Sequence, residues 1–205
     1  MTVAELLREM GNYRASLLST GFRDPDVLGG LLQPCDRGMD WVSGDDAYTW
    51  LYAFGHVARP RSGVEIGTRF GYSLWAVSSG ADSSGMDLTV YDAELDSDKD
   101  PLKVCEAWFD KQPHSLTVHR ANTQELQWLN CAPVEYAMVD ADHSEAGAYH
   151  DMQLVWPVVK PGGWILVDDT NPGDVRKAVD RFAAEAGCEF AHVRNFRGLS
   201  ILKKK

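Results

Sequence analysis

Two stretches in the first sixty residues place apolar side chains every three or four positions. This spacing predicts amphipathic helices over about residues 3–18 and 45–57, and Arg59-Pro60 ends the second one. Residues 21–44 lie between them and are rich in glycine and proline. They are expected to form turns, with one short helix around residues 26–32.

Short apolar runs alternate with helical patterns in the rest of the chain. Strands are expected at residues 64–66, 86–92, 116–119, 134–140 and 163–168, and helices at 71–79, 101–111, 123–129, 145–158 and 174–186. The last two strand-like runs, 189–193 and 199–202, are expected to form an antiparallel hairpin. The alternation predicts an α/β fold with a mostly parallel sheet and helices on both faces.

The length of 205 residues fits one domain, in which residues 1–60 are a helical N-terminal cap segment and 61–205 the core. The chain carries 20 basic and 30 acidic residues, a formal charge of −10, which disfavours nucleic acid as a partner. The charged amino terminus does not have the pattern of a signal peptide, and no stretch has the length and apolar character of a membrane span. Four cysteines without a C-x-x-C pair suit reduced thiols, so we expect a cytoplasmic protein without membrane partners.

The segment from Val64 to Ser73, V-E-I-G-T-R-F-G-Y-S, predicts a strand, a tight turn and a helix start. Gly67 allows a sharp turn or a close approach to a ligand, and Gly71 allows the helix start to lie near the strand. Unpaired N–H groups at a helix start favour electron-rich ligands, so the segment predicts a nucleotide-type site. The spacing differs from the G-x-G-x-x-G pattern of dinucleotide-binding proteins.

Two further polar sites follow predicted strands. Asp92 ends the second strand, where a carboxylate can accept hydrogen bonds from both hydroxyls of a ribose; Glu94 is the alternative. The third strand is followed by R-A-N-T-Q-E, in which Asn122 or Thr123 can also cap a helix.

Three acids are expected to meet at the carboxyl edge of the sheet. Asp140 ends the fourth strand, and the pair Asp168-Asp169 ends the fifth. Carboxylate oxygens with water completing the shell suit Mg²⁺. His143 comes three residues after Asp140 and has the chemistry of a general base near neutral pH. In the alternative interpretation, Asp142 caps the next helix and His143 has no catalytic role.

In combination, these motifs resemble class I S-adenosylmethionine (SAM)-dependent methyltransferases. E-I-G-x-x-x-G-Y-S is similar to their motif I, above all in small O-methyltransferases of the catechol and caffeoyl-CoA type. V-D-A-D, then K-P-G-G and the Asp-Asp pair, resemble the metal site of the cation-dependent members, and D-H-S resembles sugar and antibiotic-tailoring methyltransferases. The resemblance implies a Rossmann-like, seven-stranded sheet that ends in an antiparallel hairpin.

The resemblance also implies residue roles. Glu65, Gly67, Gly71, Tyr72, Ser73, Asp92, Asn122, Thr123 and Asp140 would bind SAM, with Asn122 and Thr123 at the adenine. Asp140, Asp168 and Asp169 would hold Mg²⁺, although Asp169 stands where the best-known members have Asn. His143 occupies the place of a catalytic lysine. The N-terminal segment would cap the acceptor pocket, with Trp41 and Trp50 as candidate lining residues.

The expected function is transfer of a methyl group from SAM to a hydroxyl of a small molecule. Mg²⁺ would stabilise the acceptor oxygen and His143 would take its proton, with Asp140 at the catalytic centre. Three alternatives remain open: a metal-independent methyltransferase that uses His143 alone, an NAD(P)-dependent oxidoreductase, and a non-catalytic nucleotide-binding module. A homodimer is expected only by analogy with the family.

Overall fold

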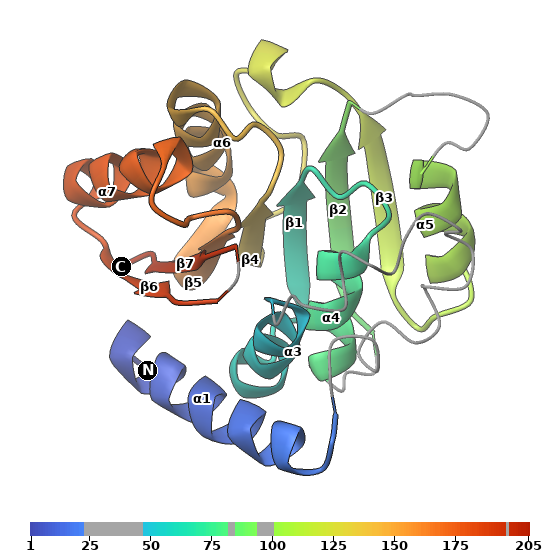
Figure 1. Ribbon diagram of the computed structural model, residues 1–205. Helices are drawn as coiled ribbons and strands as arrows, with labels where there is room; N and C mark the ends of the chain where they lie inside the picture. The colour runs from blue at the N-terminus through green and yellow to red at the C-terminus, as the bar shows by residue number, and fades with distance from the viewer. Residues whose placement is uncertain (23–46, 82–84, 94–100, 196) are drawn as a thin grey trace.

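The computed structural model describes residues 1–22, 47–81, 85–93, 101–195 and 197–205 (Figure 1). The helices are α1 (Val3–Ser19), α3 (Ala47–Ala58), α4 (Tyr72–Gly80), α5 (Pro101–Phe109), α6 (Glu145–Val158) and α7 (Asp174–Ala186), and a 3-10 turn, η2, covers Thr123–Glu125. The strands are β1 (Ser62–Ile66), β2 (Asp87–Asp92), β3 (Ser115–Arg120), β4 (Val134–Val139), β5 (Val159–Val167), β6 (Glu189–Val193) and β7 (Leu199–Lys203).

All seven strands join one sheet in the order β3-β2-β1-β4-β5-β7-β6. Strands β1 to β5 pair in parallel, whereas β7 runs antiparallel to both β5 and β6. The predicted α/β fold, a Rossmann-like sheet that ends in an antiparallel hairpin, is therefore confirmed. Because β7 returns beside β5, the turn between β6 and β7 lies at the edge where the parallel strands end.

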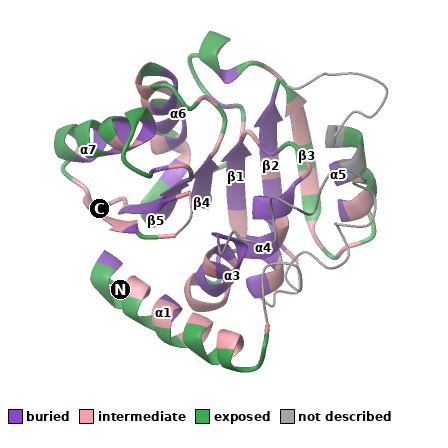
Figure 2. Ribbon diagram, viewed as in Figure 1, coloured by how far each residue is buried: buried purple, intermediate pink, exposed green. Residues whose placement is uncertain are grey.

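Successive residues of the central strands supply two separate cores. In β4, Tyr136 and Met138 pack on the side that also holds buried residues of α1, α3, α4 and α5. Ala137 and Val139 pack on the opposite side, against α6 and α7. This alternation is the period of two expected of a strand. Figure 2 shows the strands β1, β2 and β4 as largely buried, as a sheet covered on both faces requires.

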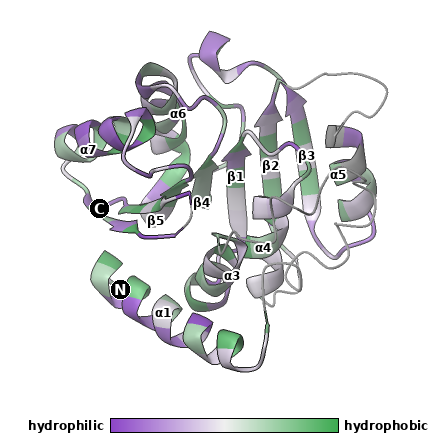
Figure 3. Cartoon of the chain, viewed as in Figure 1, coloured by the Kyte–Doolittle hydropathy of each residue, from purple (hydrophilic) through white to green (hydrophobic). Residues whose placement is uncertain are grey.

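Helix α1 illustrates how the surface helices attach. Thr2 and Glu5 form a reciprocal capping box at its start, and Val3, Leu6 and Met10 are buried. Polar and apolar residues mix along α1 and α7, as expected of helices with one buried face (Figure 3). The Val3 N–H donates to Glu189 Oε1 at 3.0 Å, so α1 is fixed near β6.

The predicted helix over residues 123–129 is wrong. Only the 3-10 turn η2 forms, and the backbone becomes extended at Leu126. Leu129 is buried and Leu126 packs beside it, so two core contacts three residues apart imitate helical spacing. The helix expected at 26–32 lies outside the described residues. Within the described residues, no helix combines the length and the apolar character that crossing a membrane requires.

Candidate active site

A cavity of about 1150 Å³ opens where β1, β2 and β4 end. The turns after β1, β2, β3, β4 and β5, the start of α3 and the β6–β7 turn all contribute to its wall. The lining residues used below are Tyr48, Gly67, Arg69, Phe70, Tyr72, Ser73, Asp92, Asn122, Thr123, Gln124, Asp140, Asp142, His143, Asp169 and Arg197. Ligand sites of open α/β sheets occur at this edge.

The two motif glycines have left-handed backbone conformations. Gly67 has φ +81° and Gly71 has φ +78°, a region in which a side chain is strained. A Cβ on Gly67 would lie 2.3 Å from the Asp140 carbonyl oxygen. The absence of a side chain at Gly67 therefore allows the β1–α4 turn to pack against the segment that follows β4.

Glu65 supports this turn from behind the cavity wall. Its side chain is fully buried, and Oε1 accepts a hydrogen bond from the Ser73 hydroxyl at 2.6 Å. Burial raises the pKa of Glu65 to about 8, although the Ser73 hydroxyl opposes this shift. Tyr72 and Ser73 line the cavity and Glu65 does not.

Asp92 lies at the cavity, as expected for the last residue of a strand. It is 7% exposed, and its Oδ2 accepts a hydrogen bond from the Arg69 backbone N–H at 2.6 Å. This bond links the end of β2 to the β1–α4 turn. The alternative residue, Glu94, lies outside the described residues.

Asn122 and Thr123 form the next part of the wall. Asn122 caps η2, because its Oδ1 accepts a hydrogen bond from the Gln124 N–H at 3.1 Å. The Thr123 hydroxyl and the Gln124 amide both donate to Asp151 Oδ1, at 2.8 and 3.0 Å. The buried Asp151 on α6 thus holds this loop from below, a role with no motif in the sequence. Burial raises the pKa of Asp151 to about 6.

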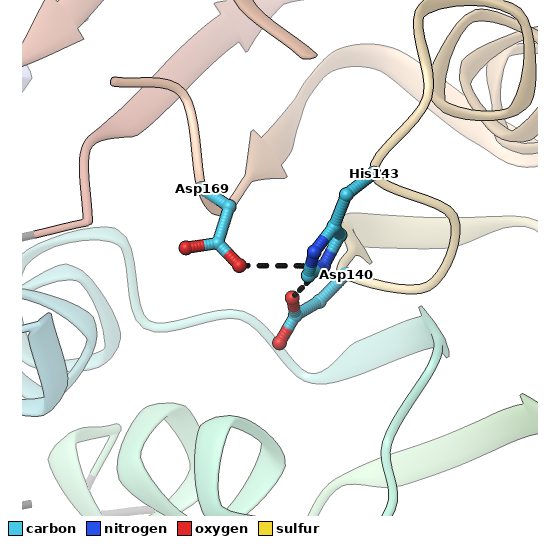
Figure 4. A group of neighbouring side chains, drawn as sticks. All are labelled: Asp140, His143 and Asp169. Atoms are coloured by element: carbon cyan, nitrogen blue, oxygen red, sulfur yellow. Dashed lines mark ion pairs between the residues drawn. The ribbon is translucent and has the colours of Figure 1, made fainter. Parts of the chain in front are cut away.

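Asp140, His143 and Asp169 form the most polar part of the site (Figure 4). His143 Nε2 lies 3.5 Å from Asp140 Oδ1 and 3.3 Å from Asp169 Oδ2. One possible metal-ligand atom from each of the three residues lies within 4.8 Å of the other two. Asp169 has φ +55°, a conformation that Asp tolerates better than most residues. The N-cap of α6 is Ser144, and not Asp142 as in the alternative interpretation: the Ser144 hydroxyl accepts a hydrogen bond from the Gly147 N–H, and Asp142 Oδ1 accepts one from the Ser144 N–H.

The protonation of this cluster follows from burial and proximity. Burial raises the pKa of Asp140, and the hydrogen bond to His143 opposes the shift. The same hydrogen bond raises the pKa of His143, with the Asp169 charge acting in the same direction. When protonated, the single imidazole of His143 therefore offsets negative charge on both Asp140 and Asp169.

Asp168 occupies a different environment from its neighbour. It is 6% exposed, and its Oδ2 lies 3.5 Å from Arg197 Nη1. Its other oxygen, Oδ1, is buried and has no hydrogen-bond partner among the described residues. Burial raises the pKa of Asp168 well above the usual range. An acid in this state gains from a cation or donor placed beside it.

These residues fit a divalent cation. Asp140 and Asp169 offer carboxylate oxygens a short distance apart, and Mg²⁺ prefers oxygen ligands completed by water. The group that the structure gathers is Asp140, Asp169 and His143, whereas the predicted set was Asp140, Asp169 and Asp168. Asp168, whose Oδ1 has no hydrogen-bond partner among the described residues, lies next to this group in sequence.

Tyr48 and Arg197 are among the cavity-wall residues that sequence reasoning missed. Tyr48 enters the wall from the start of α3, and Arg197 enters it from the β6–β7 turn. Trp50, a candidate lining residue, does not contribute; it packs against the core with the Arg14 guanidinium 5.0 Å from its ring centroid. Trp41 lies outside the described residues.

Solved structures with the same fold are numerous. An O-methyltransferase from Bacillus cereus in complex with S-adenosylhomocysteine (SAH) aligns with a TM-score of 0.61 and 14% identity, over 87% of this chain and 90% of that one. An SAH-bound methyltransferase from Podospora anserina gives 0.62 and 17%, over 88% of each chain. An O-methyltransferase of tomaymycin synthesis from Streptomyces achromogenes, in complex with SAM, gives 0.55 and 17%, over 78% and 80%. At these identities the likeness establishes the fold.

The family is established by a separate comparison. No curated protein sequence matches the chain. A family model described as a methyltransferase domain matches residues 64–170, which is more than half of the sequence. The match includes the β1–α4 turn, Asp92, Asp140, His143 and Asp169. It agrees with the resemblance drawn from the motifs, and the chain belongs to this family of methyltransferases.

Proposed function

We propose that the protein transfers a methyl group from SAM to a hydroxyl oxygen of a small molecule, with assistance from Mg²⁺. One observation carries the proposal: a single cavity joins a nucleoside-type wall to a cluster of His143 with two carboxylates. The family assignment and the SAM- or SAH-bound O-methyltransferases of the same fold support the methyl donor. The cavity volume suits a cofactor with a small acceptor.

The donor end of the cavity would lie along β1, β2 and β3. Asp92 would accept hydrogen bonds from the ribose hydroxyls, and Asn122 with Thr123 would border the adenine. Gly67 and Gly71 shape the turn between these contacts and the acid cluster. SAM, when bound, supplies a methyl group on a positively charged sulfur.

At the acceptor end, His143 would remove the proton from the attacking hydroxyl. Its Nε2 faces Asp140 and Asp169, which orient the imidazole and stabilise the imidazolium that forms. The walls would hold the oxygen in line with the methyl group, which lowers the barrier by positioning. Asp140 and Asp169 would hold Mg²⁺, which supplies positive charge beside the acceptor oxygen.

Calorimetric titration with SAH, first without and then with Mg²⁺, tests the two parts separately. We expect SAH to bind the purified protein, and Mg²⁺ to give a binding heat that EDTA abolishes. Asp169→Asn and Asp140→Ala should both reduce the heat of Mg²⁺ binding. SAH should still bind the Asp169→Asn variant.

A matched control is Asp174→Asn, which removes an exposed carboxylate outside the cavity. This variant should retain both the SAH and the Mg²⁺ heats. Absence of SAH binding would remove the methyl-donor proposal. SAH binding without any Mg²⁺ heat would instead favour a metal-independent reaction that relies on His143.

A further inference from the structure

We propose that His192 is a positioning residue of the active site. Through Ser200 it holds Thr170, the residue that follows Asp169. The turn at this point directs the Asp169 carboxylate to His143. The inference rests on the proposed function, since it concerns the acid cluster of that site. It adds a residue that lies outside the cavity wall and outside the part of the chain that the family model matches.

A chain of polar contacts runs from the surface of α7 through the β6–β7 hairpin to the segment after β5. His192 Nε2 lies 2.9 Å from Asp180 Oδ1, and His192 Nδ1 lies 2.6 Å from Ser200 Oγ. Ser200 Oγ lies 2.8 Å from Thr170 Oγ1. A carboxylate accepts hydrogen bonds and a hydroxyl can both donate and accept, so each step can pair one donor with one acceptor. We term these four residues the hairpin relay.

The strand register builds this relay into the protein interior. His192 and Ser200 lie directly opposite each other in β6 and β7, so their side chains share one face of the sheet. Ser200 is fully buried and Thr170 is 2% exposed, whereas the Asp180 side chain is 53% exposed. Leu202, two residues along β7, packs in the core with α6 and α7. A hydroxyl buried in such surroundings needs its partners, so the position of Thr170 is tied to that of His192.

The turn after β5 requires support of this kind. Asp169 has φ +55°, and a residue other than glycine keeps this conformation only where its surroundings hold it. The Thr170 N–H donates to the Gly198 carbonyl at 3.1 Å, and the Asn171 N–H also donates to a carbonyl of the β6–β7 turn, at 2.9 Å. A Cβ on Gly198 would lie 2.3 Å from the Asn171 nitrogen, so the two segments are in close contact. The relay adds a side-chain contact to these backbone bonds.

The orientation of Asp169 depends on this turn. Its Oδ2 lies 3.3 Å from His143 Nε2, and Figure 4 shows the carboxylate pointing at the imidazole. Asp168, one residue earlier, contacts Arg197 instead. A change in the turn would therefore move the Asp169 carboxylate relative to His143. A displacement of about 1 Å is enough to impair a catalytic arrangement, even when the substituted residue is remote from it.

The NMR signal of the His143 ring tests the inference without cofactor, metal or turnover. A structural role and a positioning role both predict that loss of a relay hydrogen bond lowers stability, but only positioning predicts a change at His143. His143→Gln identifies the signal among the six histidines by removing it. Asp169→Asn removes the facing carboxylate and gives the reference displacement. All spectra are recorded at one pH with EDTA present.

The relay variants come in pairs. Thr170→Val removes the hydroxyl at nearly equal volume and should displace the His143 signal toward the reference, whereas Thr170→Ser keeps the hydroxyl and should not. His192→Leu should displace the signal, and His192→Asn should restore most of the wild-type position because its amide lies near the place of Nδ1. Ser200→Ala breaks the relay at its buried centre and should act like Thr170→Val. SAH affinity should stay unchanged in all five variants.

Val193→Ala is the matched control for loss of stability. Val193 adjoins His192 on β6 and is buried in the other core, which includes α1. Its truncation should lower the free energy of unfolding in urea, as the relay variants do, because it removes buried apolar contacts. The His143 signal should stay at its wild-type position in this variant.

A His143 signal that stays in place in Ser200→Ala and Thr170→Val overturns the inference, as does an equal displacement in Val193→Ala. Equal displacement in His192→Leu and His192→Asn assigns the effect to packing and overturns it too. An unmoved signal in Asp169→Asn means that Asp169 does not face His143, which leaves the relay nothing to position. Failure of SAH to bind is a separate result: it removes the proposed function, and with it the part of His192 in catalysis, whatever the His143 signal shows.

Discussion

The close contact at Gly67 makes a measurable prediction about the β1–α4 turn. In Gly67→Ala the new methyl group would lie 2.3 Å from the carbonyl oxygen of Asp140, 2.6 Å from its carbonyl carbon and 2.7 Å from the Ala141 Cα. All three atoms belong to backbone, so no rotamer change removes the overlap. The two turns must separate by about 1 Å to restore ordinary contact.

The expected loss in the free energy of unfolding has two parts, and a variant at a second glycine measures one of them alone. The left-handed conformation alone costs an alanine ~1 kcal/mol, and overlap with a packed neighbour adds ~1–3 kcal/mol. Gly162 has φ +79°, and no heavy atom of the described residues lies within 4 Å of the position of a Cβ, so Gly162→Ala carries the first part only. Gly67→Ala should therefore lower the free energy of unfolding by ~2–4 kcal/mol, and Gly162→Ala by ~1 kcal/mol.

Urea unfolding with a shared m-value gives the two stabilities, and calorimetry gives SAH affinity. We expect SAH affinity to fall at least tenfold in Gly67→Ala, because the turn that borders both ligand ends has moved, and to stay unchanged in Gly162→Ala. Equal destabilisation of the two variants, or full SAH affinity in Gly67→Ala, would refute the steric reasoning.

Variants at three further residues test other parts of the site. His143→Gln should lower kcat for any acceptor by about 10²–10⁴ with SAH affinity kept, and an unchanged kcat excludes the base role. Glu65 has a pKa of about 8 when folded against 4.5 in the unfolded chain, so the folded state holds the extra proton and stability falls as pH rises between these values, by ~1.4 kcal/mol per unit at most. Glu65→Gln keeps an acceptor for Ser73 and should flatten the pH dependence of urea unfolding from pH 5 to 8; an unaltered slope contradicts the raised pKa. Asp151→Ala should weaken SAH binding about tenfold by releasing Thr123, whereas Asp151→Asn keeps the acceptor oxygen, so equal loss in both variants contradicts the role of that oxygen.

The sequence predicts the sheet well because each central strand is a short apolar run with helical patterns on both sides. The predicted bounds of α6, α7 and β6 match the observed ones. Ser144 marks the start of α6 and Gly187 the end of α7, and the hairpin turn separates β6 from β7. The helix at 123–129 fails because apolar spacing reports which residues face the core and not how the backbone reaches it. Leu126 and Leu129 reach it from an irregular segment, which leaves Trp128 72% exposed.

The site is predictable where topology alone decides the placement of a residue. Asp92 ends β2, and Asp140 and the Asp168-Asp169 pair directly follow β4 and β5, so all four must lie at one edge of the sheet. The role of each acid at this edge is harder to predict from the sequence, because adjacent residues after a strand point in different directions. Asp168 turns toward Arg197 and Asp169 toward His143, and the left-handed backbone at Asp169 that produces this has no sequence signal.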